Sequence, residues 1–541
     1  MASTDRIFPI PGIEHGNRIL ASVIETRALD KHTHPWVSVP INDADLSRGY
    51  KDLSFWQLNN AANHAAQWLS QQLSAEPFQC FAYAGPKDLR YPILAVAAAK
   101  LQKVMILPSP LVTPDAQMRI FEKKNCTFYL RPQAMADHVD GVLRGASNFQ
   151  VITVPELDEF LKDDEATQFV YKKSWKEGEG DPWLVFHTSG TTGYPKPITY
   201  TQSMMASIDC FASLTDAEPS IIEQFALRRW YTPLPSLHFV GTFLVLSMTS
   251  FIHTTIVLGP SAPPSPEIVV NILRYGHVQG ALLTPALTDE LCLKPHGLEA
   301  LRELKYLHYT GAPLSAKTGK QLENHVMISS AVGSSEAGPY FAAVHDHPDA
   351  WDYLVFQKHL GAKFEHRMND LYELVFVRQP ETGVQQIFKV YPELDRFPTN
   401  DLWREHPVHK GLWKIIGRAD DYIYLSHADG LHASSLEPEI EAHPGIKSAL
   451  IGGHGRSAPV LIVEPFPEAD LNTDSGRQAL IISLQPYIDK VNSRCHECVQ
   501  LSNERLIFAC KEKPFVRTIK GSVARLQTLA LYEDEISALF I

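Results

Sequence analysis

The chain has 541 residues, of which 45% are hydrophobic, and its formal net charge is −12 at pH 7. This length exceeds what a single hydrophobic core usually organises, so two or three domains are expected. The acidic balance and the lack of a long basic run argue against a nucleic acid as the main partner. Seven scattered cysteines are typical of a reducing compartment and do not suggest a disulfide framework.

The stretches that could direct the chain to a membrane lack the required composition. Residues 1–10 include Asp5 and Arg6 and have no long apolar core, so no secretory signal is expected. Residues 239–259 are the most apolar, but serine, threonine and histidine interrupt them too often for a lipid span. They predict a core helix followed by a strand over 255–258. We therefore expect a soluble, cytoplasmic protein without a membrane partner.

The first part of the chain alternates between helical and extended patterns. Apolar residues at helical spacing predict an amphipathic helix over 52–72. Residues 81–84 read as a strand, 93–101 as an alanine-rich buried helix and 104–108 as the next strand. Such alternation predicts doubly wound α/β subdomains. The charged segment 163–181 is expected to be an exposed loop.

A short apolar strand, Trp183 to Phe186, leads into a polar string. Its members are small, carry a hydroxyl group or are positively charged: Thr188, Ser189, Gly190, Thr191, Thr192, Gly193 and Lys196. Glycines let backbone N–H groups turn toward anionic oxygens, and hydroxyl groups and a lysine add donors and charge. This chemistry suits a polyphosphate, although the spacing is not that of a Walker A loop. A plain surface turn is the alternative.

The ordered string resembles the phosphate loop of the adenylate-forming superfamily, which includes acyl-CoA ligases, luciferases and the adenylation domains of peptide synthetases and carboxylic acid reductases. The resemblance implies an α/β protein with a large N-terminal core of doubly wound subdomains and a small mobile α+β C-terminal domain. It implies ATP and Mg²⁺ as cofactors. The core would be residues 1–419, binding ATP and the acid, and residues 420–541 the mobile domain, with Asp420 as the hinge.

Later motifs follow in the family's order. In Val332-Gly333-Ser334-Ser335-Glu336, Glu336 would hold Mg²⁺, as a hard carboxylate ligand should. Ser335 and Val332 would contact ATP and Ser334 the acid, although Val332 departs from the family's usual aromatic residue.

Two turns and a hinge motif complete the resemblance. The turn at 310–314 would lie along the adenine and the acyl pocket, and its contacts would come from Gly311, Ala312 and Pro313. Asp401, after Thr399 and Asn400, would accept hydrogen bonds from the ribose. Asn400 replaces a glycine, which asparagine tolerates because it enters left-handed conformations readily. Arg418 belongs to the hinge motif Gly417-Arg418-Ala419-Asp420-Asp421 and would contact ATP.

The C-terminal part reads as a small α+β unit. Its expected strands are 422–425, 448–451 and 460–463, and its expected helices are 436–443, 475–492 and 532–539. The family's catalytic lysine slot is occupied by Ser522, but Lys520 lies two residues earlier in Arg517-Thr518-Ile519-Lys520-Gly521-Ser522. That string resembles the one in fungal synthetase-like carboxylic acid reductases, which implies Lys520 as the catalytic lysine beside Lys196. A solvated loop lysine is the alternative.

The segment 234–241 indicates which class of substrate the protein binds. Amino-acid-activating domains usually place an aspartate just after the position of His238, because a buried ammonium needs a partner. In this chain that position is Phe239, whose side chain cannot pair with an ammonium group. The substrate is therefore expected to be a small carboxylic acid without an α-amino group, with an aryl acid one option and a quaternary ammonium acid another. His238 would cap the pocket or approach the carboxylate, or it is a structural core histidine.

The sequence contains no carrier motif and no dinucleotide-binding glycine motif after a strand. The leading interpretation is an adenylation unit cut from a longer enzyme, whose partners are a carrier domain bearing phosphopantetheine and a reductase domain. A standalone acyl-CoA ligase is the second interpretation. A non-catalytic nucleotide-binding module that has lost its lysine is the third.

Overall fold

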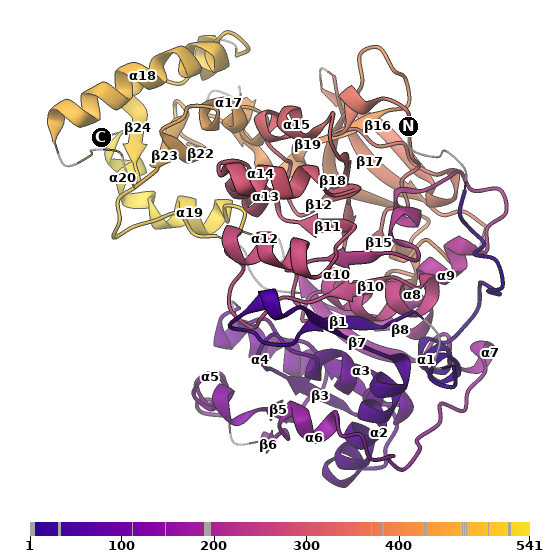
Figure 1. The fold of residues 1–541 in the computed structure, drawn as a ribbon. Helices are drawn as coiled ribbons and strands as arrows, with labels where there is room; N and C mark the ends of the chain where they lie inside the picture. The colour runs from indigo at the N-terminus through magenta and orange to yellow at the C-terminus, as the bar shows by residue number, and fades with distance from the viewer. Residues whose placement is uncertain are drawn as a thin grey trace. The chain divides into compact units, whose positions relative to one another are not determined.

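The structure is a computed structural model that describes residues 6–540 with gaps at 31–33, 111, 147, 189–195, 369, 381–382, 427–429, 468, 470, 472, 496 and 518–520. The chain forms two compact units (Figure 1). The first unit consists of Met1–Thr310, Ala316–Ala362 and Val377–Phe397, and the second of Gly311–Ser315, Lys363–Phe376 and Pro398–Ile541. Across the described ranges, no helix has the length and hydropathy needed to cross a lipid bilayer.

The first unit contains two large sheets. One has the strand order β6-β5-β3-β4-β7-β8 and the other β13-β12-β11-β9-β10-β1-β2. The strands of the former are β3 Cys80–Tyr83, β4 Val104–Ile106, β5 Phe128–Arg131, β6 Gln150–Thr153, β7 Pro182–Thr188 and β8 Lys196–Thr201. Those of the latter are β1 Val37–Pro40, β2 Tyr50–Leu53, β9 Arg229–Tyr231, β10 Thr255–Val257, β11 Gly280–Leu283, β12 Tyr306–Tyr309 and β13 Met327–Ser330. All neighbours are parallel except β7–β8 and β1–β2.

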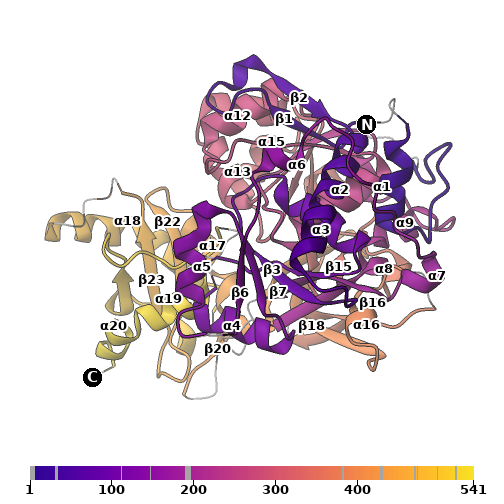
Figure 2. The ribbon, with the colours of Figure 1, turned by 90° about the horizontal axis from the view of Figure 1, so that it is seen from below.

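Helices alternate with these strands, as a doubly wound fold requires. Their bounds are α1 Leu20–Ala28, α2 Phe55–Gln72, α3 Arg90–Lys100, α4 Pro114–Lys123, α5 Ala136–Val142, α6 Leu157–Phe160, α7 Trp175–Gly178, α8 Gln202–Met205, α9 Ser207–Ala212, α10 Phe239–Thr242, α11 Thr249–Ile252, α12 Pro266–Tyr275, α13 Pro285–Cys292, α14 Pro295–Arg302, α15 Ala316–Leu322 and α16 Ile387–Val390. A short hairpin, β14 Gly333–Ser334 and β15 Gly338–Pro339, follows β13. Helix α2 packs on α1 and α3, and Figure 2 shows α2 and α3 side by side.

The expected helix over 52–72 is confirmed as α2, and its start has a local cause. Ser54 caps the helix because its hydroxyl oxygen accepts from the N–H of Gln57 at 3.2 Å, while the Gln57 side chain accepts from the N–H of Ser54 at 2.9 Å. This reciprocal pair satisfies two N–H groups that a helix start otherwise leaves unbonded.

The apolar stretch 239–259 is helical and then extended, as expected, but its helix is not uniform. Between α10 and α11 lies a π-helical segment, η4 Phe243–Met248, and strand β10 follows. The stretch is buried, with Leu246, Met248 and Phe251 fully so. Such a wide turn is rare and changes which side chains face the same direction.

The expectation of an exposed loop over 163–181 is only partly right. Ala166 and Tyr171 are each 6% exposed, and the segment includes the short helix α7. Its backbone is held by side chains from distant helices: Asn60 of α2 accepts from the N–H of Ala166 at 2.9 Å, and Glu25 of α1 accepts from the N–H of Tyr171 at 3.0 Å. Long-range bonds of this kind leave no local sequence signal.

The carboxyl ends of the parallel strands are where the sequence motifs occur. The phosphate-loop string follows β7, the segment 234–241 follows β9, and the motif ending at Glu336 follows β13. The connections reverse direction between β3 and β4 in one sheet and between β9 and β10 in the other. Ligands of doubly wound sheets bind at the carboxyl ends near such reversals, so the fold places these motifs where a ligand is expected.

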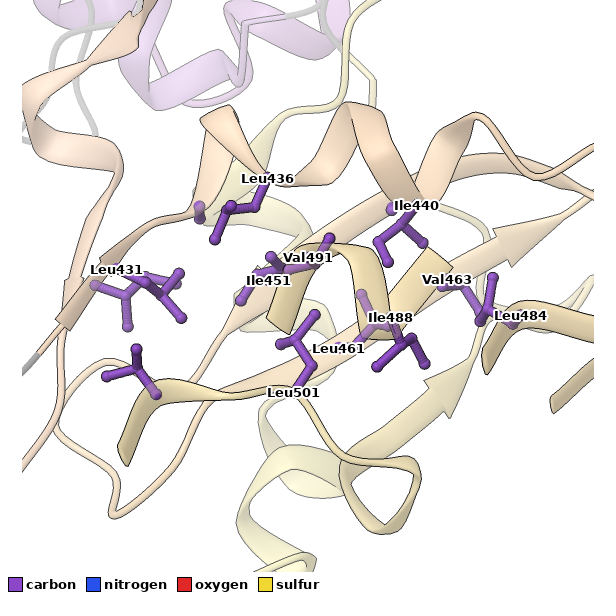
Figure 3. Close-up of a cluster of buried hydrophobic side chains, with 14 of the residues drawn as sticks. Leu431, Leu436, Ile440, Ile451, Leu461, Val463, Leu484, Ile488, Val491 and Leu501 are labelled. Atoms are coloured by element: carbon purple, nitrogen blue, oxygen red, sulfur yellow. The ribbon is translucent and has the colours of Figure 1, made fainter. Parts of the chain in front are cut away.

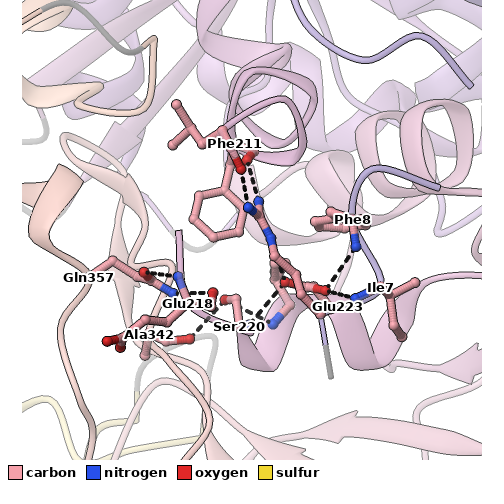
Figure 4. Close-up of polar contacts among 11 residues, drawn as sticks. Ile7, Phe8, Phe211, Glu218, Ser220, Glu223, Ala342 and Gln357 are labelled. Carbon is pink, nitrogen blue, oxygen red and sulfur yellow. Dashed lines mark hydrogen bonds and ion pairs between the residues drawn. The ribbon is translucent and has the colours of Figure 1, made fainter. Parts of the chain in front are cut away.

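Glu223 ties distant segments of the first unit together (Figure 4). Its carboxylate accepts from the backbone N–H groups of Ile7, Phe8 and Ser220, at 2.5, 3.1 and 3.1 Å. The Ser220 hydroxyl donates in turn to the carbonyl of Ala342 at 2.8 Å. Residues near the amino end are thereby joined to the segment that follows β15. Burial raises the pKa of Glu223.

The second unit holds a four-stranded sheet of order β16-β17-β18-β19 and a smaller α+β part. The sheet strands are β16 Ala362–Met368, β17 Leu371–Val377, β18 Arg396–Glu405 and β19 Trp413–Arg418. The remaining elements are β20 Tyr422–Tyr424, β21 Gly430–His432, α17 Glu437–Glu441, β22 Ile446–Gly452, β23 Val460–Pro465, α18 Asp474–Asn492, β24 Leu506–Phe508, α19 Arg525–Leu531 and α20 Glu533–Ala538. The expected elements over 422–425, 436–443, 448–451, 460–463, 475–492 and 532–539 correspond to β20, α17, β22, β23, α18 and α20.

One apolar cluster explains why the α+β part folds as a unit (Figure 3). Leu484, Ile488 and Val491 of α18 pack with Ile440 of α17 and Val463 of β23 in this cluster. All five side chains are at most 1% exposed. The spacing of 484, 488 and 491 puts one face of α18 toward the cluster, as an amphipathic helix requires.

Candidate active site

A hairpin frames the phosphate-loop string. Strands β7 and β8 pair antiparallel, and their last pair is Thr188 with Lys196. Ser189, Gly190, Thr191, Thr192 and Gly193 lie outside the described residues. The paired ends nevertheless fix where the string leaves and rejoins the sheet, and Lys196 is exposed.

His187 sits at the base of this hairpin. Its Nε2 accepts a hydrogen bond from the N–H of Ser109, which follows β4, at 3.0 Å. An accepting Nε2 carries no proton, and burial lowers the pKa of His187 to about 4. The ring is therefore neutral at pH 7 and links the carboxyl ends of β4 and β7. This contact could not be predicted from local sequence, because it joins residues 78 positions apart.

Glu336 lies at the tip of the hairpin β14–β15. The hairpin is tight because Gly333 pairs with Pro339 and Ser334 with Gly338. Gly338 has a φ of +71°, and a Cβ there would lie 2.6 Å from a side-chain atom of Gln386, so only glycine fits.

Ser334 stabilises the turn itself, because its hydroxyl accepts from the N–H of Ala337 at 3.0 Å. Ser334, Ser335 and Val332 are all partly exposed.

The negative charge of Glu336 acts on two phenols. Burial and then this charge raise the pKa of Tyr200 well above its usual range, and the same two causes raise the pKa of Tyr391. Tyr200 is fully buried, and none of the described residues hydrogen-bonds its hydroxyl. Tyr200 lies four residues beyond Lys196 and was not among the residues predicted from the sequence.

Tyr200 belongs to an aromatic cluster at the start of α10. Its ring centroid lies 4.8 Å from that of Phe239 and 5.2 Å from that of Phe186. Phe239 also contacts Phe243 at 5.3 Å and is 5% exposed. Phe239 is therefore a buried phenyl ring among other rings.

His238 precedes α10 with an extended backbone. Its N–H donates to the carbonyl of Pro235 at 3.1 Å, and its carbonyl accepts from the N–H of Thr242 at 3.0 Å. A Cβ on Gly241 would lie 2.2 Å from the Pro235 carbonyl oxygen, so this turn needs a glycine. The turn brings His238 and Phe239 to the carboxyl end of β9.

In the second unit, Asp401 and Arg418 are direct cross-strand partners on β18 and β19, with Nη1 of Arg418 3.3 Å from Oδ1 of Asp401. The N–H of Asp401 donates to the Thr399 hydroxyl at 3.0 Å, and that hydroxyl donates to the carbonyl of Leu374 at 2.9 Å. Asn400 has a φ of +60°, as its replacement of a glycine predicted.

The other residues of the second unit that were predicted to belong to the site are mostly exposed or partly exposed. Gly311 has a φ of +95° and is exposed, as is Pro313, while Ala312 is partly exposed. Lys520 lies outside the described residues. The backbone of Asp420 lies in a single turn before β20.

Glu336 suits a magnesium ion held mainly by phosphate oxygens. Mg²⁺ usually takes one or two carboxylates together with phosphates and water, and seldom an all-protein cage. A single carboxylate at the tip of a hairpin fits this mode. When bound, Mg²⁺ would neutralise negative charge on the phosphates.

Comparisons with known proteins agree on one family. The AMP-binding enzyme family matches residues 33–361, and the AMP-binding enzyme C-terminal domain matches residues 420–541. The carboxylic acid reductase of Neurospora crassa is 31% identical over 97% of this chain, and the adenylate-forming reductase Nps9 of Serpula lacrymans is 24% identical over 90%. The chain spans 51% and 46% of these two relatives, or about half of each.

A solved structure supports the same fold. The ATP-bound MatB of Rhodopseudomonas palustris superposes with a TM-score of 0.73 at 16% identity, covering 95% of this chain and 99% of that one. At this identity the likeness concerns the fold, and the family assignment depends on the sequence matches. The chain therefore belongs to the AMP-binding enzymes of the adenylate-forming superfamily.

Proposed function

We propose that this enzyme uses ATP to activate a carboxylic acid that lacks an α-amino group, and that it then passes the acyl group to the phosphopantetheine thiol of a carrier domain. Family membership establishes adenylate-forming chemistry. The substrate class, the acceptor and the roles of individual residues are the proposal.

The observation that carries the substrate class is the environment of Phe239. A buried ammonium requires a carboxylate or an equivalent partner, since leaving it unpaired costs several kcal/mol. Phe239 offers an apolar ring that is packed against Phe186, Tyr200 and Phe243. Aromatic walls favour an aryl acid through ring contacts.

Adenylation is attack by a carboxylate oxygen of the acid on the α-phosphorus of ATP, with pyrophosphate as the leaving group. The protein's part is positioning and charge neutralisation. We assign the phosphate contacts to Thr188, Ser189, Gly190, Thr191, Thr192, Gly193 and Lys196. Lys520 would neutralise charge between the carboxylate and the phosphorus, and Glu336 would hold Mg²⁺.

The adenosine and acid contacts come from other elements in this assignment. Asp401 and Arg418 form a cross-strand ion pair, and Asp401 would accept hydrogen bonds from the ribose hydroxyls. Gly311, Ala312, Pro313, Val332 and Ser335 would complete the ATP site. His238, Phe239, Gly311 and Ser334 would line the acid site.

The domain boundary is also proposed, with a core over 1–419 and a mobile domain over 420–541. The match of the C-terminal family domain, which begins at residue 420, supports it. Rotation about Asp420 would remove Lys520 from the site and admit the thiol, since hinge motions commonly let one site serve two steps.

The acceptor is inferred from the relatives. Two of them are named as reductases, and this chain covers about half of each. Carrier and reductase domains are therefore the proposed partners. A standalone acyl-CoA ligase would instead release a free CoA thioester, and a non-catalytic module would bind ATP without activating an acid.

The test is ATP–pyrophosphate exchange with the purified chain and a panel of benzoic, cinnamic, short aliphatic, betaine and amino acids. We expect exchange with a non-amino acid and none with α-amino acids. Preferred exchange with an α-amino acid would overturn the substrate class. ATP binding without exchange for any acid would favour the non-catalytic module.

A second assay separates the two acceptors. The acyl-adenylate formed by the enzyme is mixed with free CoA or with a pantetheinylated carrier domain from a related reductase, and the thioester is measured. Faster transfer to the carrier supports the proposal, whereas faster transfer to CoA supports the ligase.

A further inference from the structure

The hairpin that carries Glu336 continues directly into the segment 340–344. The N–H of Tyr340 donates to the carbonyl of Val332 at 3.0 Å, which joins the two ends of the hairpin. Tyr340 and Phe341 are buried, with exposed fractions of 4% and 0%. The place of Glu336 in the first unit therefore depends on how the segment 340–344 is held.

The segment 340–344 is held by the turn 219–221. The carbonyl of Ala342 accepts two hydrogen bonds from this turn, one from the N–H of Ile221 at 3.0 Å and one from the hydroxyl of Ser220 at 2.8 Å. Figure 4 shows the bond between Ser220 and Ala342. Because both lone pairs of this carbonyl are used, a shift of the turn would move the segment with it.

Glu223 bonds both this turn and the segment near the amino end. Its Oε1 accepts from the N–H of Ser220 at 3.1 Å. Its Oε2 accepts from the N–H groups of Ile7 and Phe8 at 2.5 and 3.1 Å (Figure 4). Glu223 is only 3% exposed. Hydrogen bonds to a carboxylate are stronger than neutral ones, so this buried group joins the two segments firmly.

Two stacked rings make a second connection. Phe341 stacks on Phe211 of α9, with ring centroids 4.5 Å apart and planes at 6°. The carbonyl of Phe211 accepts from Nη2 of Arg6 at 3.2 Å, and the Arg6 guanidinium lies 5.6 Å from the centre of the Phe211 ring. Nε of Arg6 also lies 3.5 Å from Oε1 of Glu223. The amino-end segment thus reaches the segment 340–344 through a carboxylate and through a ring.

We propose that Glu223 is a positioning residue for the binding of Mg²⁺: it fixes the segment 340–344 and, through this segment, the carboxylate of Glu336. All of the residues involved belong to the first unit. The inference rests on the proposed role of Glu336. Mg²⁺ demands a near-ideal octahedral geometry, so a displaced carboxylate binds it less well.

Glu223→Gln is the informative variant, because it keeps the shape of the side chain but replaces an oxygen by an amide nitrogen that cannot accept from a backbone N–H. Glu218→Gln is the matched control. Glu218 is exposed, and its bonds with Gln357 are made by its backbone N–H and carbonyl. Ser220→Ala is a milder second variant, which removes the hydroxyl bond to Ala342 and leaves Glu223 in place.

The first measurement is hydrogen exchange of the peptide that covers residues 331–344, in the full chain without ATP or Mg²⁺. We expect exchange to become faster by about 10-fold in Glu223→Gln and about 3-fold in Ser220→Ala, because a loosened segment exposes its amides. Glu218→Gln should leave the rate unchanged. Exchange at the wild-type rate in Glu223→Gln, or in Ser220→Ala if Glu223→Gln does not fold, would overturn the inference.

The second measurement is the Mg²⁺ dependence of ATP–pyrophosphate exchange. We expect Glu223→Gln to raise the Mg²⁺ concentration for half-maximal exchange by about 3- to 10-fold, with kcat at saturating Mg²⁺ changed by less than about 3-fold. A merely structural role would reduce the amount of active protein and leave the Mg²⁺ dependence unchanged. In a Glu336→Gln background, Glu223→Gln should not change the Mg²⁺ dependence further, because no carboxylate remains to be positioned.

The outcomes separate this inference from the proposed function. An unchanged Mg²⁺ dependence in Glu223→Gln would overturn the inference. An equal rise with and without the Glu336 carboxylate would mean that Glu223 does not act through Glu336, which also overturns the inference and leaves the proposed function standing. A wild-type Mg²⁺ dependence in Glu336→Gln would show that the metal assignment is wrong, and the inference falls with it.

Discussion

At the scale of single residues, burial decides which chemistry a side chain can offer. Phe239 is buried and its neighbours are rings, so the position cannot accept an ion without loss. Tyr200 is the opposite case, since it is a polar group in the same cluster whose hydroxyl no described residue bonds. Its phenol remains neutral, because burial and the charge of Glu336 raise its pKa.

Removing the Tyr200 hydroxyl should leave the free energy of unfolding unchanged or raise it. A buried hydroxyl without a partner costs about 1–3 kcal/mol, and phenylalanine keeps the ring. We expect Tyr200→Phe to raise the free energy of unfolding by about 1 kcal/mol, measured by chemical denaturation. Phe186→Leu, which removes a ring of the same cluster, serves as the control and should destabilise the protein. A loss of more than about 1 kcal/mol in Tyr200→Phe would mean that the hydroxyl has a partner.

Glu336 gives the prediction about metal. If its carboxylate holds Mg²⁺, Glu336→Gln should raise the Mg²⁺ concentration needed for half-maximal ATP–pyrophosphate exchange by at least about 10-fold. Glu393, an exposed carboxylate whose charge also acts on Tyr391, is the matched control. Glu393→Gln should leave the Mg²⁺ dependence unchanged. An unchanged dependence in Glu336→Gln would contradict the assignment.

At the scale of elements, the sequence pattern predicted those helices and strands whose limits depend on neighbouring residues. Helix α2 begins after a capping residue and has one apolar face, so the spacing predicted the helix, although residues 52–53 of the predicted range lie in strand β2. Strands β16 to β19 were not predicted. In β16 the charged Lys363, Glu365 and Arg367 lie on a partly exposed strand, so no apolar alternation marks it.

The site shows the same division between local and long-range signals. The motifs that contain Glu336, Asp401 and Arg418 were found from short strings, and Asn400 adopts the backbone conformation that its string implied. The bond of His187 to Ser109 and the effect of the Glu336 charge on Tyr200 were not predictable, because each involves residues that are far apart in the sequence and come together only in the folded protein.

Substitutions of Asn400 in strand β18 test whether its backbone conformation affects stability. Its φ of +60° is costly for most residues, by about 1–2 kcal/mol, but not for glycine and less for asparagine. We expect Asn400→Ala to lower the free energy of unfolding by about 1 kcal/mol and Asn400→Gly to change it by less than about 0.5 kcal/mol. Equal effects of the two substitutions would show that the backbone conformation is not the cause.

At the scale of the whole molecule, buried neutral histidines link stability to pH. Burial lowers the pKa of His187 to about 4 and those of His253 and His308 to about 3. In the unfolded chain each histidine titrates near 6.5. As the pH falls below 6.5, these histidines become protonated in the unfolded chain but stay neutral in the folded chain. The stability that each group contributes is complete above pH 6.5 and is lost as the pH falls toward the folded pKa, near 4 for His187 and near 3 for His253 and His308.

His187→Gln isolates one of these groups. Glutamine can accept from the N–H of Ser109 but does not titrate. A single such histidine should cost about 2 kcal/mol between pH 7 and pH 5. We expect the wild type to lose that much more unfolding free energy over this interval than His187→Gln, measured by denaturant titration at both pH values. Parallel losses in the two proteins would show that His187 is charged in the folded state.

The attachment of Ile7 and Phe8 to Glu223 has a consequence for engineering. These two residues complete the bonding of a buried carboxylate that also bonds the N–H of Ser220. Removing residues 6–8 would take these two backbone donors away from that carboxylate, so a chimera should keep this segment together with its own core.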